Sequence, residues 1–117
     1  MIALAGLDAR LRPYAERAIE YAHRLGVTVE VTSVRRSEDE QRRLYQRWLA
    51  GKNRYPVARP GESAHQYGAA WDSTVKPEHQ ELWNAIRRAF GWNVPGNDLV
   101  HAELPDWDAW RSALRYS

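Results

Sequence analysis

One stretch of the sequence combines two candidate metal ligands with the residues of a tight reversal: Gly61-Glu62-Ser63-Ala64-His65-Gln66-Tyr67-Gly68-Ala69-Ala70-Trp71-Asp72. In fully extended backbone, His65 and Asp72 would lie about 23 Å apart, whereas a shared metal requires each within about 2.1 Å of the ion. The chain must therefore turn back between them. Gly68 can adopt the backbone angles of a sharp reversal, and the two alanines that follow it leave room beside the site. Asp72 is then expected to project from a strand beyond the turn.

A second segment supplies another histidine and two more carboxylates: Asn97-Asp98-Leu99-Val100-His101-Ala102-Glu103. In a strand, His101 and Glu103 share one face. Asp98 can join His101 only from the turn ahead of the strand. Residues 95–97 predict that turn because they read Pro-Gly-Asn.

Together the two segments have the composition of a catalytic metal site. The imidazoles of His65 and His101 and the carboxylate of Asp72 leave a fourth zinc position open, as is typical of catalytic rather than structural zinc. Asp98 is then a free carboxylate that could take a proton from an attacking water and return it to a leaving amine. By spacing alone, capping and hydrogen-bonding roles in loops stay open for all four residues.

The composition is typical of a single globular domain, which we assign to residues 1–117. The 117 residues are 44% apolar and 27% charged, and none is cysteine, which excludes disulfide frameworks and thiolate metal sites. The formal net charge is +2, and 15 of the 17 basic residues are arginine, a bias that suits anionic surroundings. The N-terminal apolar stretch is short and soon meets Asp8 and Arg10, so we expect no signal peptide, no membrane insertion and a cytoplasmic location when the protein is made.

Apolar spacing predicts helices and short strands in mixed order. Asp8 is the predicted N-cap of the first helix, and Pro13 places its true start nearer Leu11. Ser37 and Glu40 form a capping box at the start of the second helix. Because the elements form no regular βαβ units, the predicted fold class is α+β. The predicted helices cover residues 8–25, 37–51 and 77–90 and resume at residue 105, and the predicted strands cover residues 27–32, 68–75 and 99–104.

Three blocks of the sequence together resemble a known enzyme family. The run Ser63-x-His65-x-x-Gly68-x-Ala70-x-Asp72, followed by Asp98-x-x-His101, resembles the signature of the zinc D-alanyl-D-alanine carboxypeptidases and L-alanyl-D-glutamate endopeptidases, most closely the short catalytic domains of phage endolysins. Upstream, Thr32-Ser33-Val34-Arg35-Arg36-Ser37-x-x-Glu40-Gln41-x-x-Leu44-Tyr45 is similar to the family's Ser-Gly-x-Arg-Ser...Gln...Leu-Tyr block, with Val34 in place of the usual glycine. The blocks follow the family's order and span most of residues 32–103.

The resemblance implies a hedgehog/DD-peptidase-like fold, in which a small antiparallel sheet packs with helices, and one zinc ion per chain. It assigns the zinc ligands to His65, Asp72 and His101, the general base to Asp98, a clamp for a substrate carboxylate or an oxyanion to Arg36, and further substrate contacts to Ser63 and Gln41. Guanidinium geometry suits either anionic group. The departure at Val34 leaves Arg35 open as an alternative clamp.

The substrate implied by the resemblance is the stem peptide of peptidoglycan. In the phage enzymes that this chain resembles, the base is typically aspartate and the activity an endopeptidase, whereas carboxypeptidase members typically carry glutamate there. Asp98 therefore favours an L-alanyl-D-glutamate endopeptidase, with a D-alanyl-D-alanine carboxypeptidase as the alternative. Without a signal peptide, the enzyme would act on the cell wall after release, for example with the help of a pore-forming partner.

Two other classes of protein are alternatives to an enzyme, and several of the candidate residues have plainer alternative roles. Arginines interleaved with aromatic residues over 42–59 suggest a nucleic-acid-binding module, yet residues 38–40 are acidic, so a solvated helix face explains the pattern better and no nucleic-acid partner is expected. A catalytically inactive, zinc-bearing binding domain is disfavoured because a purely structural site does not need Asp98. The plainer roles are an Asx turn for Asp98, an exposed position for Arg36 and a supporting position for Glu103.

The six tryptophans divide into two groups. Four fall at helical spacing and are predicted in the core, and two are candidates to flank a cleft. The first group is Trp48, Trp83, Trp107 and Trp110, and the second is Trp71 and Trp92.

Overall fold

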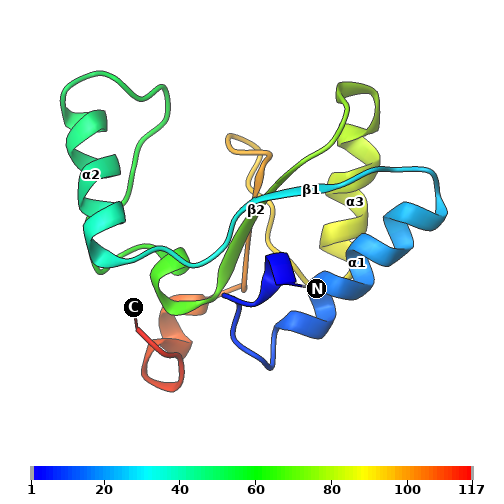
Figure 1. Ribbon diagram of the computed structural model, residues 1–117, viewed down its shortest axis with the longest axis horizontal. Coiled ribbons are helices and arrows are strands. Elements are labelled where there is room, and N and C mark those ends of the chain that lie inside the picture. The colour runs from blue at the N-terminus through cyan, green and yellow to red at the C-terminus, as the bar shows by residue number, and fades with distance from the viewer. Residues whose placement is uncertain (1, 117) are drawn as a thin grey trace.

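The computed structural model describes residues 2–116, which form a three-stranded antiparallel sheet with helices around it (Figure 1). In chain order the elements are the 3-10 helix η1 (Ile2–Leu4), α1 (Arg12–Arg24), β1 (Glu30–Ser33), α2 (Glu38–Leu49), η2 (Ala64–Tyr67), β2 (Ala70–Thr74), η3 (Pro77–His79), α3 (Gln80–Ala89), β3 (His101–Glu103) and η4 (Trp107–Ala113). The strand order is β1-β2-β3, so β2 is central. Figure 1 shows α1 and α3 packed together on one side and α2 at the opposite end of the molecule. The predicted α+β fold with a small antiparallel sheet is confirmed.

The central strand β2 brings the two candidate ligand segments together. It pairs antiparallel with β3, and Asp72 lies opposite His101. On its other edge it pairs with β1, where Ser33 lies opposite Asp72 beyond a bulge that begins at Val31. Because successive side chains of a strand point to opposite faces, Asp72 faces the site while Trp71 faces the helices.

The core lies between the sheet, α1 and α3. Three buried alanines give α1 a face that can approach its neighbours closely. Trp71 makes edge-to-face contacts with Trp83 and Trp92, with ring centroids 5.9 and 5.6 Å apart. Each such aromatic pair adds about 0.5–1.5 kcal/mol beyond the burial of its area.

The structure corrects the predictions for five tryptophans. Of the four predicted in the core, only Trp83 is fully buried, and Trp48 and Trp107 are half-buried. Trp71 and Trp92, considered as candidates to flank the cleft, are buried in the core. The physical reason at Trp71 is strand alternation, because the face opposite Asp72 is the core face. Trp110, predicted in the core, keeps 58% of its surface exposed. It lies on η4, whose three-residue turn does not continue the spacing expected of an α-helix.

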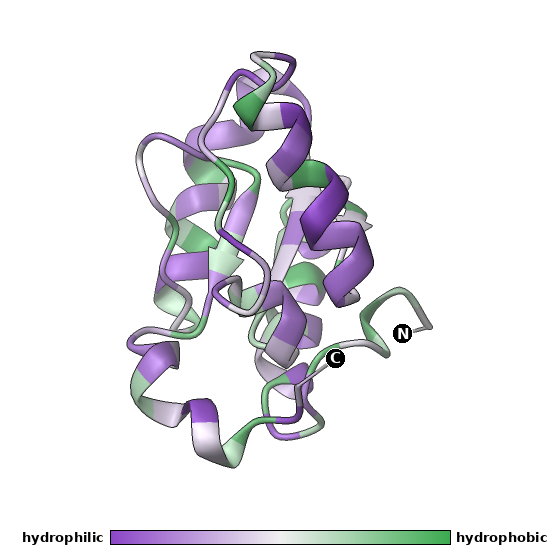
Figure 2. Ribbon diagram, turned by 90° about the vertical axis from the view of Figure 1, so that its left-hand side faces the viewer, coloured by the Kyte–Doolittle hydropathy of each residue, from purple (hydrophilic) through white to green (hydrophobic). Residues whose placement is uncertain are grey.

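Helix α2 extends away from this core. Its buried side chain is Gln41, and Trp48 is only half-buried. Figure 2, which looks onto this side of the molecule, shows α2 as mostly hydrophilic. Across residues 2–116, no helix combines the length and the apolar character needed to cross a bilayer.

Some element boundaries differ from the predicted ones. Helix α1 starts at Arg12, with Pro13 in its first turn, and has no side-chain cap. Asp8, predicted as that cap, instead accepts hydrogen bonds from the backbone and side chain of Arg10. The capping box at the start of α2 is confirmed. The other differences are that β1 and β3 begin later, at Glu30 and His101, that the helix predicted over 77–90 divides into η3 and α3, and that the C-terminal helix is the 3-10 helix η4.

Gly68 makes the reversal that the first ligand segment requires. Its φ is +67°, in the left-handed region. A Cβ atom at this position would overlap Arg35 Nη2 and lie 3.0 Å from both the backbone nitrogen of Asp8 and the carbonyl oxygen of Gly6. A side chain is therefore excluded both by the backbone conformation and by the N-terminal segment packed against the turn.

We expect Gly68→Ala to lower the free energy of unfolding more than Gly26→Ala does. Gly26 has a φ of +82° but no atom within 4 Å of an added Cβ. Its replacement should therefore cost only the left-handed backbone, about 1–2 kcal/mol. At Gly68 steric overlap adds to that cost, for a total of about 2–5 kcal/mol. Urea unfolding followed by circular dichroism measures both variants, and equal losses would show that only the backbone angle matters at Gly68.

Candidate active site

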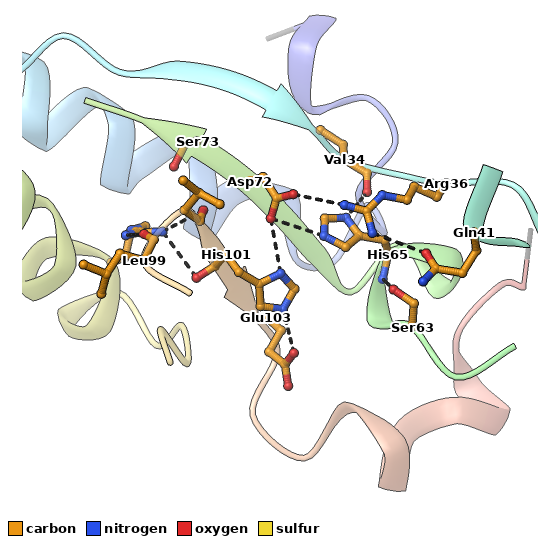
Figure 3. Close-up of polar contacts among 12 residues, drawn as sticks. Val34, Arg36, Gln41, Ser63, His65, Asp72, Ser73, Leu99, His101 and Glu103 are labelled. Carbon is orange, nitrogen blue, oxygen red and sulfur yellow. Dashed lines mark hydrogen bonds and ion pairs between the residues drawn. The ribbon is translucent and has the colours of Figure 1, made fainter. Parts of the chain in front are cut away.

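Three side chains predicted as metal ligands converge at one point of the structure (Figure 3). His65 comes from η2, Asp72 from β2 and His101 from β3. The nitrogen and oxygen atoms that they offer all lie within 4.8 Å of one another. Asp72 Oδ1 lies 3.2 Å from both His65 Nε2 and His101 Nδ1. The reversal at Gly68 and the register of β2 with β3 produce this arrangement.

His65 is oriented so that one ring nitrogen is free to bind a metal. Its Nδ1 lies 2.5 Å from the carbonyl oxygen of Val34. Because a carbonyl only accepts hydrogen bonds, Nδ1 carries a hydrogen, which leaves Nε2 as the ring nitrogen that can bind a metal. That Nε2 is buried and has no hydrogen-bond partner among the described residues. A buried polar atom without a partner is costly, and a metal ion would remove the cost. The donor set of two imidazoles and one carboxylate therefore fits zinc.

The charges of His101 and Asp72 stabilise each other. Burial alone would lower the pKa of His101, but hydrogen bonds with Asp72 and Glu103 raise it to about 9. Burial alone would raise the pKa of Asp72, but the contacts with His101 and His65 hold it well below its usual range. Without a metal, His101 is therefore a cation at neutral pH, paired with the carboxylate of Asp72.

Glu103 fixes the second ring nitrogen of His101. Glu103 Oε1 lies 2.7 Å from His101 Nε2, so His101 Nδ1 is left to face Asp72. The contact follows from the predicted shared face of His101 and Glu103 in β3. A carboxylate on the outer nitrogen of a ligand histidine orients the ring and raises its basicity. This geometry agrees with the supporting position expected for Glu103.

Arg36 lies beside the ligands. Its Nη2 donates to Asp72 Oδ2 at 3.1 Å, and its Nη1 donates to Gln41 Oε1 at 3.3 Å. Its side chain is 20% exposed, so the plainer interpretation of an exposed surface residue is wrong. The guanidinium borders the cleft described below.

The two residues assigned to further substrate contacts make hydrogen bonds within the protein. Gln41 Nε2 donates to the carbonyl oxygen of Ala58 at 2.8 Å. Ser63 Oγ accepts from the backbone nitrogen of His65 at 3.3 Å and so caps η2. Both residues border the cleft. Their hydrogen bonds nevertheless hold a loop, Arg36 and His65 in place, so the geometry supports positioning roles for them.

Arg35 points away from the cleft and does not replace Arg36. Its Nε donates to the carbonyl oxygen of Gly6 at 3.0 Å, and its Nη1 donates to that of Arg115 at 2.7 Å. Consecutive residues of an extended segment project to opposite sides, so only one of the two arginines can face the site. Arg35 instead ties both terminal segments of the chain to the fold.

Asp98 presents a carboxylate that makes no hydrogen bond to any described residue. The turn is closed by its main chain, which donates to Pro95 O at 3.3 Å and accepts from His101 N at 3.2 Å, so an Asx turn is not formed. Burial raises the pKa of Asp98 above its usual range, against the opposing effect of His101. A free carboxylate with a raised pKa is suited to accept and return a proton.

The site opens into a cleft of about 420 Å³. The ligands and Asp98 line one part of it, and α2, residues 53–58 and Trp107 line the remainder. The volume is in the range of pockets that hold small ligands. The lining contains arginines as well as carboxylates, which suits a short peptide with charges of both signs.

The sequence analysis missed Arg87, which supports the site from α3. It is fully buried and donates to the carbonyl oxygens of Leu99 and Val100 at 2.6 and 3.1 Å. These two residues separate the predicted base from the third predicted ligand. The signal that could have revealed Arg87 is its position four residues after Trp83, on the buried face of the helix.

The cationic state of His101 predicts that zinc binding weakens as pH falls. A metal must displace the proton of His101, whose pKa is about 9. Below that pH, each unit should therefore lower the apparent zinc affinity about tenfold. Competition with a chelating dye between about pH 6.5 and 8.5, corrected for protonation of the dye, measures the slope.

Glu103→Gln is the matched variant for this experiment. The substitution removes a carboxylate that raises the pKa of His101. The zinc affinity of the variant should therefore level off at a lower pH than the zinc affinity of the wild type does. A wild-type affinity that does not change with pH would contradict the prediction, because it would show that His101 is neutral before zinc binds.

Solved structures of several carboxypeptidases share this fold. The LdcB LD-carboxypeptidase, studied for its recognition of peptidoglycan, has 18% identity and a TM-score of 0.69, over 92% of this chain and 64% of that chain. A VanY D,D-pentapeptidase variant from the VanB-type vancomycin resistance cassette, in complex with Zn(II), has 21% identity and a TM-score of 0.70, over 92% and 76%. VanYB in complex with D-alanine-D-alanine has 20% identity and a TM-score of 0.72, over 92% and 77%. The chain thus spans less than two thirds of LdcB. No curated protein sequence matches it.

A family model identifies the chain more directly. The VanY model, described as D-alanyl-D-alanine carboxypeptidase, matches residues 5–97. The match includes Arg36, His65 and Asp72 and ends one residue before Asp98. The structure places Asp98 and His101, which lie beyond the match, at the same site. The chain belongs to the VanY family of D-alanyl-D-alanine carboxypeptidases.

Proposed function

We propose that this chain is a zinc-dependent peptidase that hydrolyses peptide bonds in the stem peptides of peptidoglycan. The observation that carries the proposal is the convergence of His65 Nε2, Asp72 Oδ1 and His101 Nδ1 in a cleft that also contains the free carboxylate of Asp98. Membership of the VanY family and the Zn(II) bound to a VanY variant of similar fold support it. When bound, zinc would polarise the carbonyl group of the scissile bond and lower the pKa of water in the site.

Asp98 is the residue that we assign as general base. Its carboxylate takes a proton from water as the water oxygen bonds to the carbonyl carbon. The same proton then passes to the amide nitrogen as the C–N bond breaks, which releases the amine. The raised pKa of Asp98 favours this exchange, because a carboxylate of higher pKa is a stronger base toward water.

Arg36 is the residue that we assign to the anionic part of the substrate. A guanidinium has more donors than the two that contact Asp72 and Gln41, so donors remain for a ligand in the cleft. Those two contacts hold the planar group in one orientation, which reduces the entropy lost when a carboxylate binds. The bound group is either a terminal carboxylate or the oxyanion that forms at the attacked carbonyl.

Two bonds of the stem peptide are candidates for cleavage. The terminal D-alanyl-D-alanine bond is favoured by the family description and by the D-alanine-D-alanine bound to VanYB. The L-alanyl-D-glutamate bond is favoured by the aspartate at position 98, which resembles the base of the phage endopeptidases. The carboxypeptidase has the broader support. Its substrate ends in a free carboxylate, and this difference makes the two activities separable by experiment.

Asp98→Asn should abolish most hydrolysis and leave zinc bound. Asparagine matches aspartate in size, and the turn is closed by main-chain hydrogen bonds, so the fold should be unchanged. The amide cannot accept a proton from water, and kcat should fall by about 10²–10⁴-fold. Mass spectrometry of peptides released from purified peptidoglycan measures the rate, and elemental analysis measures the zinc.

The matched control is Asp106→Asn, which makes the same chemical change at an exposed aspartate outside the cleft. Asparagine tolerates the φ of +54° at this position, so activity and zinc content should be normal. If Asp98→Asn keeps activity within about threefold of the wild type, the base is another carboxylate, and Glu103 is the next to test.

The bond that is cut can be identified with two pentapeptides that end in D-alanyl-D-alanine. One has a free terminal carboxylate, and the other has a terminal amide. If Arg36 binds that carboxylate, amidation should slow the release of the last residue by about 10²–10³-fold. Arg36→Ala should slow cleavage of the free peptide to a similar degree and have little further effect on the amide. An endopeptidase would instead cut both peptides equally and release their N-terminal L-alanine. Cleavage of neither peptide, and of no wall fragment, would refute the proposed function.

A further inference from the structure

We propose that Arg87 is the positioning residue for the catalytic segment, which we define as residues 98–101. The inference rests on the proposed function, because this segment carries the assigned base and one assigned zinc ligand. The Nη2 of Arg87 donates to Leu99 O at 2.6 Å, and its Nη1 donates to Val100 O at 3.1 Å and to His101 O at 3.4 Å. One buried side chain thus binds three consecutive carbonyl groups of the catalytic segment.

These contacts add to the sparse strand pairing at the start of β3. Strand β3 begins only at His101, so Leu99 and Val100 lie ahead of the paired residues. Val100 O also accepts from the backbone nitrogen of Ser73 at 3.0 Å, which joins the segment to β2 next to Asp72. A cation that attracts three successive carbonyl groups fixes their directions. It thereby determines where the chain enters β3 (Figure 3). It also determines where the preceding turn lies at the cleft.

Neighbours on α3 hold Arg87 in its orientation. Asn84 Oδ1 accepts from Arg87 Nη2 and from Gln80 Nε2, both at 2.8 Å. The guanidinium carbon of Arg87 lies 5.2 Å from the ring centroid of Trp83, whose Nε1 donates to Ser73 Oγ at 2.9 Å. The network therefore connects α3 to β2 as well as to the catalytic segment.

The spread of its acceptors makes the role of Arg87 specific to a guanidinium group. Burial lowers the pKa of Arg87 to about 10, so the side chain remains a cation at neutral pH. Among residues 2–116 no carboxylate lies within ion-pair distance of Arg87, and its charge is offset by the carbonyl groups of the catalytic segment and by the more distant carboxylates of Asp72 and Asp98. Lysine would keep the charge but offers a single nitrogen, which cannot reach acceptors as widely spaced as a planar fork can.

The test compares Arg87→Lys with Arg88→Lys in the full chain. Arg88 is the exposed neighbour on α3, and its Nη2 contacts Val94 O at 2.8 Å, outside the catalytic segment. Both substitutions keep the charge. For each protein, zinc affinity is measured by dye competition, the visible spectrum is recorded with cobalt in place of zinc, and kcat, KM and Tm are determined with stem peptides.

Arg87→Lys should bind zinc about 10–100-fold more weakly, which is the usual loss when the support of a metal ligand is removed. Its cobalt spectrum should shift, and kcat should fall while KM changes by less than about threefold, because the α2 side of the cleft is untouched. Arg88→Lys should match the wild type in every measurement. A lower Tm with wild-type zinc affinity, spectrum and kcat would show a merely structural role and overturn the proposal.

Asn84→Ala keeps the test decisive if Arg87→Lys does not fold. It removes one acceptor of Arg87 Nη2 but leaves the guanidinium, so zinc affinity should fall by about three- to tenfold. Wild-type affinity in this variant would overturn the proposal. The zinc measurement is also independent of the proposed function: a wild-type chain that binds zinc and cleaves no stem peptide refutes the function, while the affinity comparison still decides the role of Arg87.

Discussion

The buried carboxylate of Asp72 is the group on which the architecture of the site depends. Its Oδ1 lies 3.2 Å from His65 Nε2 and from His101 Nδ1, and its Oδ2 lies 3.1 Å from Arg36 Nη2. An ionised carboxylate removed from water is costly unless donors such as His101 Nδ1 and Arg36 Nη2 surround it. Asp72 therefore requires β3 and the segment before α2 to meet at the central strand. The cleft lies where these three elements meet.

Strand β2 separates the residues that stabilise the fold from those available for chemistry. On one face Trp71 packs against Trp83 and Trp92, and on the other Asp72 meets its polar partners. Gly68 and Arg87 are different, because each joins the site to the packing around it: Gly68 admits the N-terminal segment, and Arg87 connects the catalytic segment to α3.

Part of the arginine bias of this chain serves carbonyl groups within the fold. A guanidinium has several donors in one plane and can satisfy more than one carbonyl where the backbone leaves regular structure. Loops and chain ends are the places where such unpaired carbonyl groups occur. For these residues, the bias reflects internal hydrogen bonding more than an anionic partner. Within residues 2–116, the arginines that donate to backbone oxygens are Arg10, Arg12, Arg35, Arg87 and Arg88.

The sequence by itself determined the capping box of α2 and the reversal at Gly68, because each depends on residue identity at short spacing. The order of the predicted elements indicated the α+β class, and the resemblance of three sequence blocks to a known family indicated the residues that meet at the candidate site. Only the tertiary structure decided that Arg36 and not Arg35 faces the cleft, that Trp71 belongs to the core, and that Arg87 holds the catalytic segment. The physical reason is that Arg35 and Arg87 bind backbone carbonyls. Every residue type presents the same carbonyl acceptor, so the identity of the partner carries no signal, and only its position in the folded chain does.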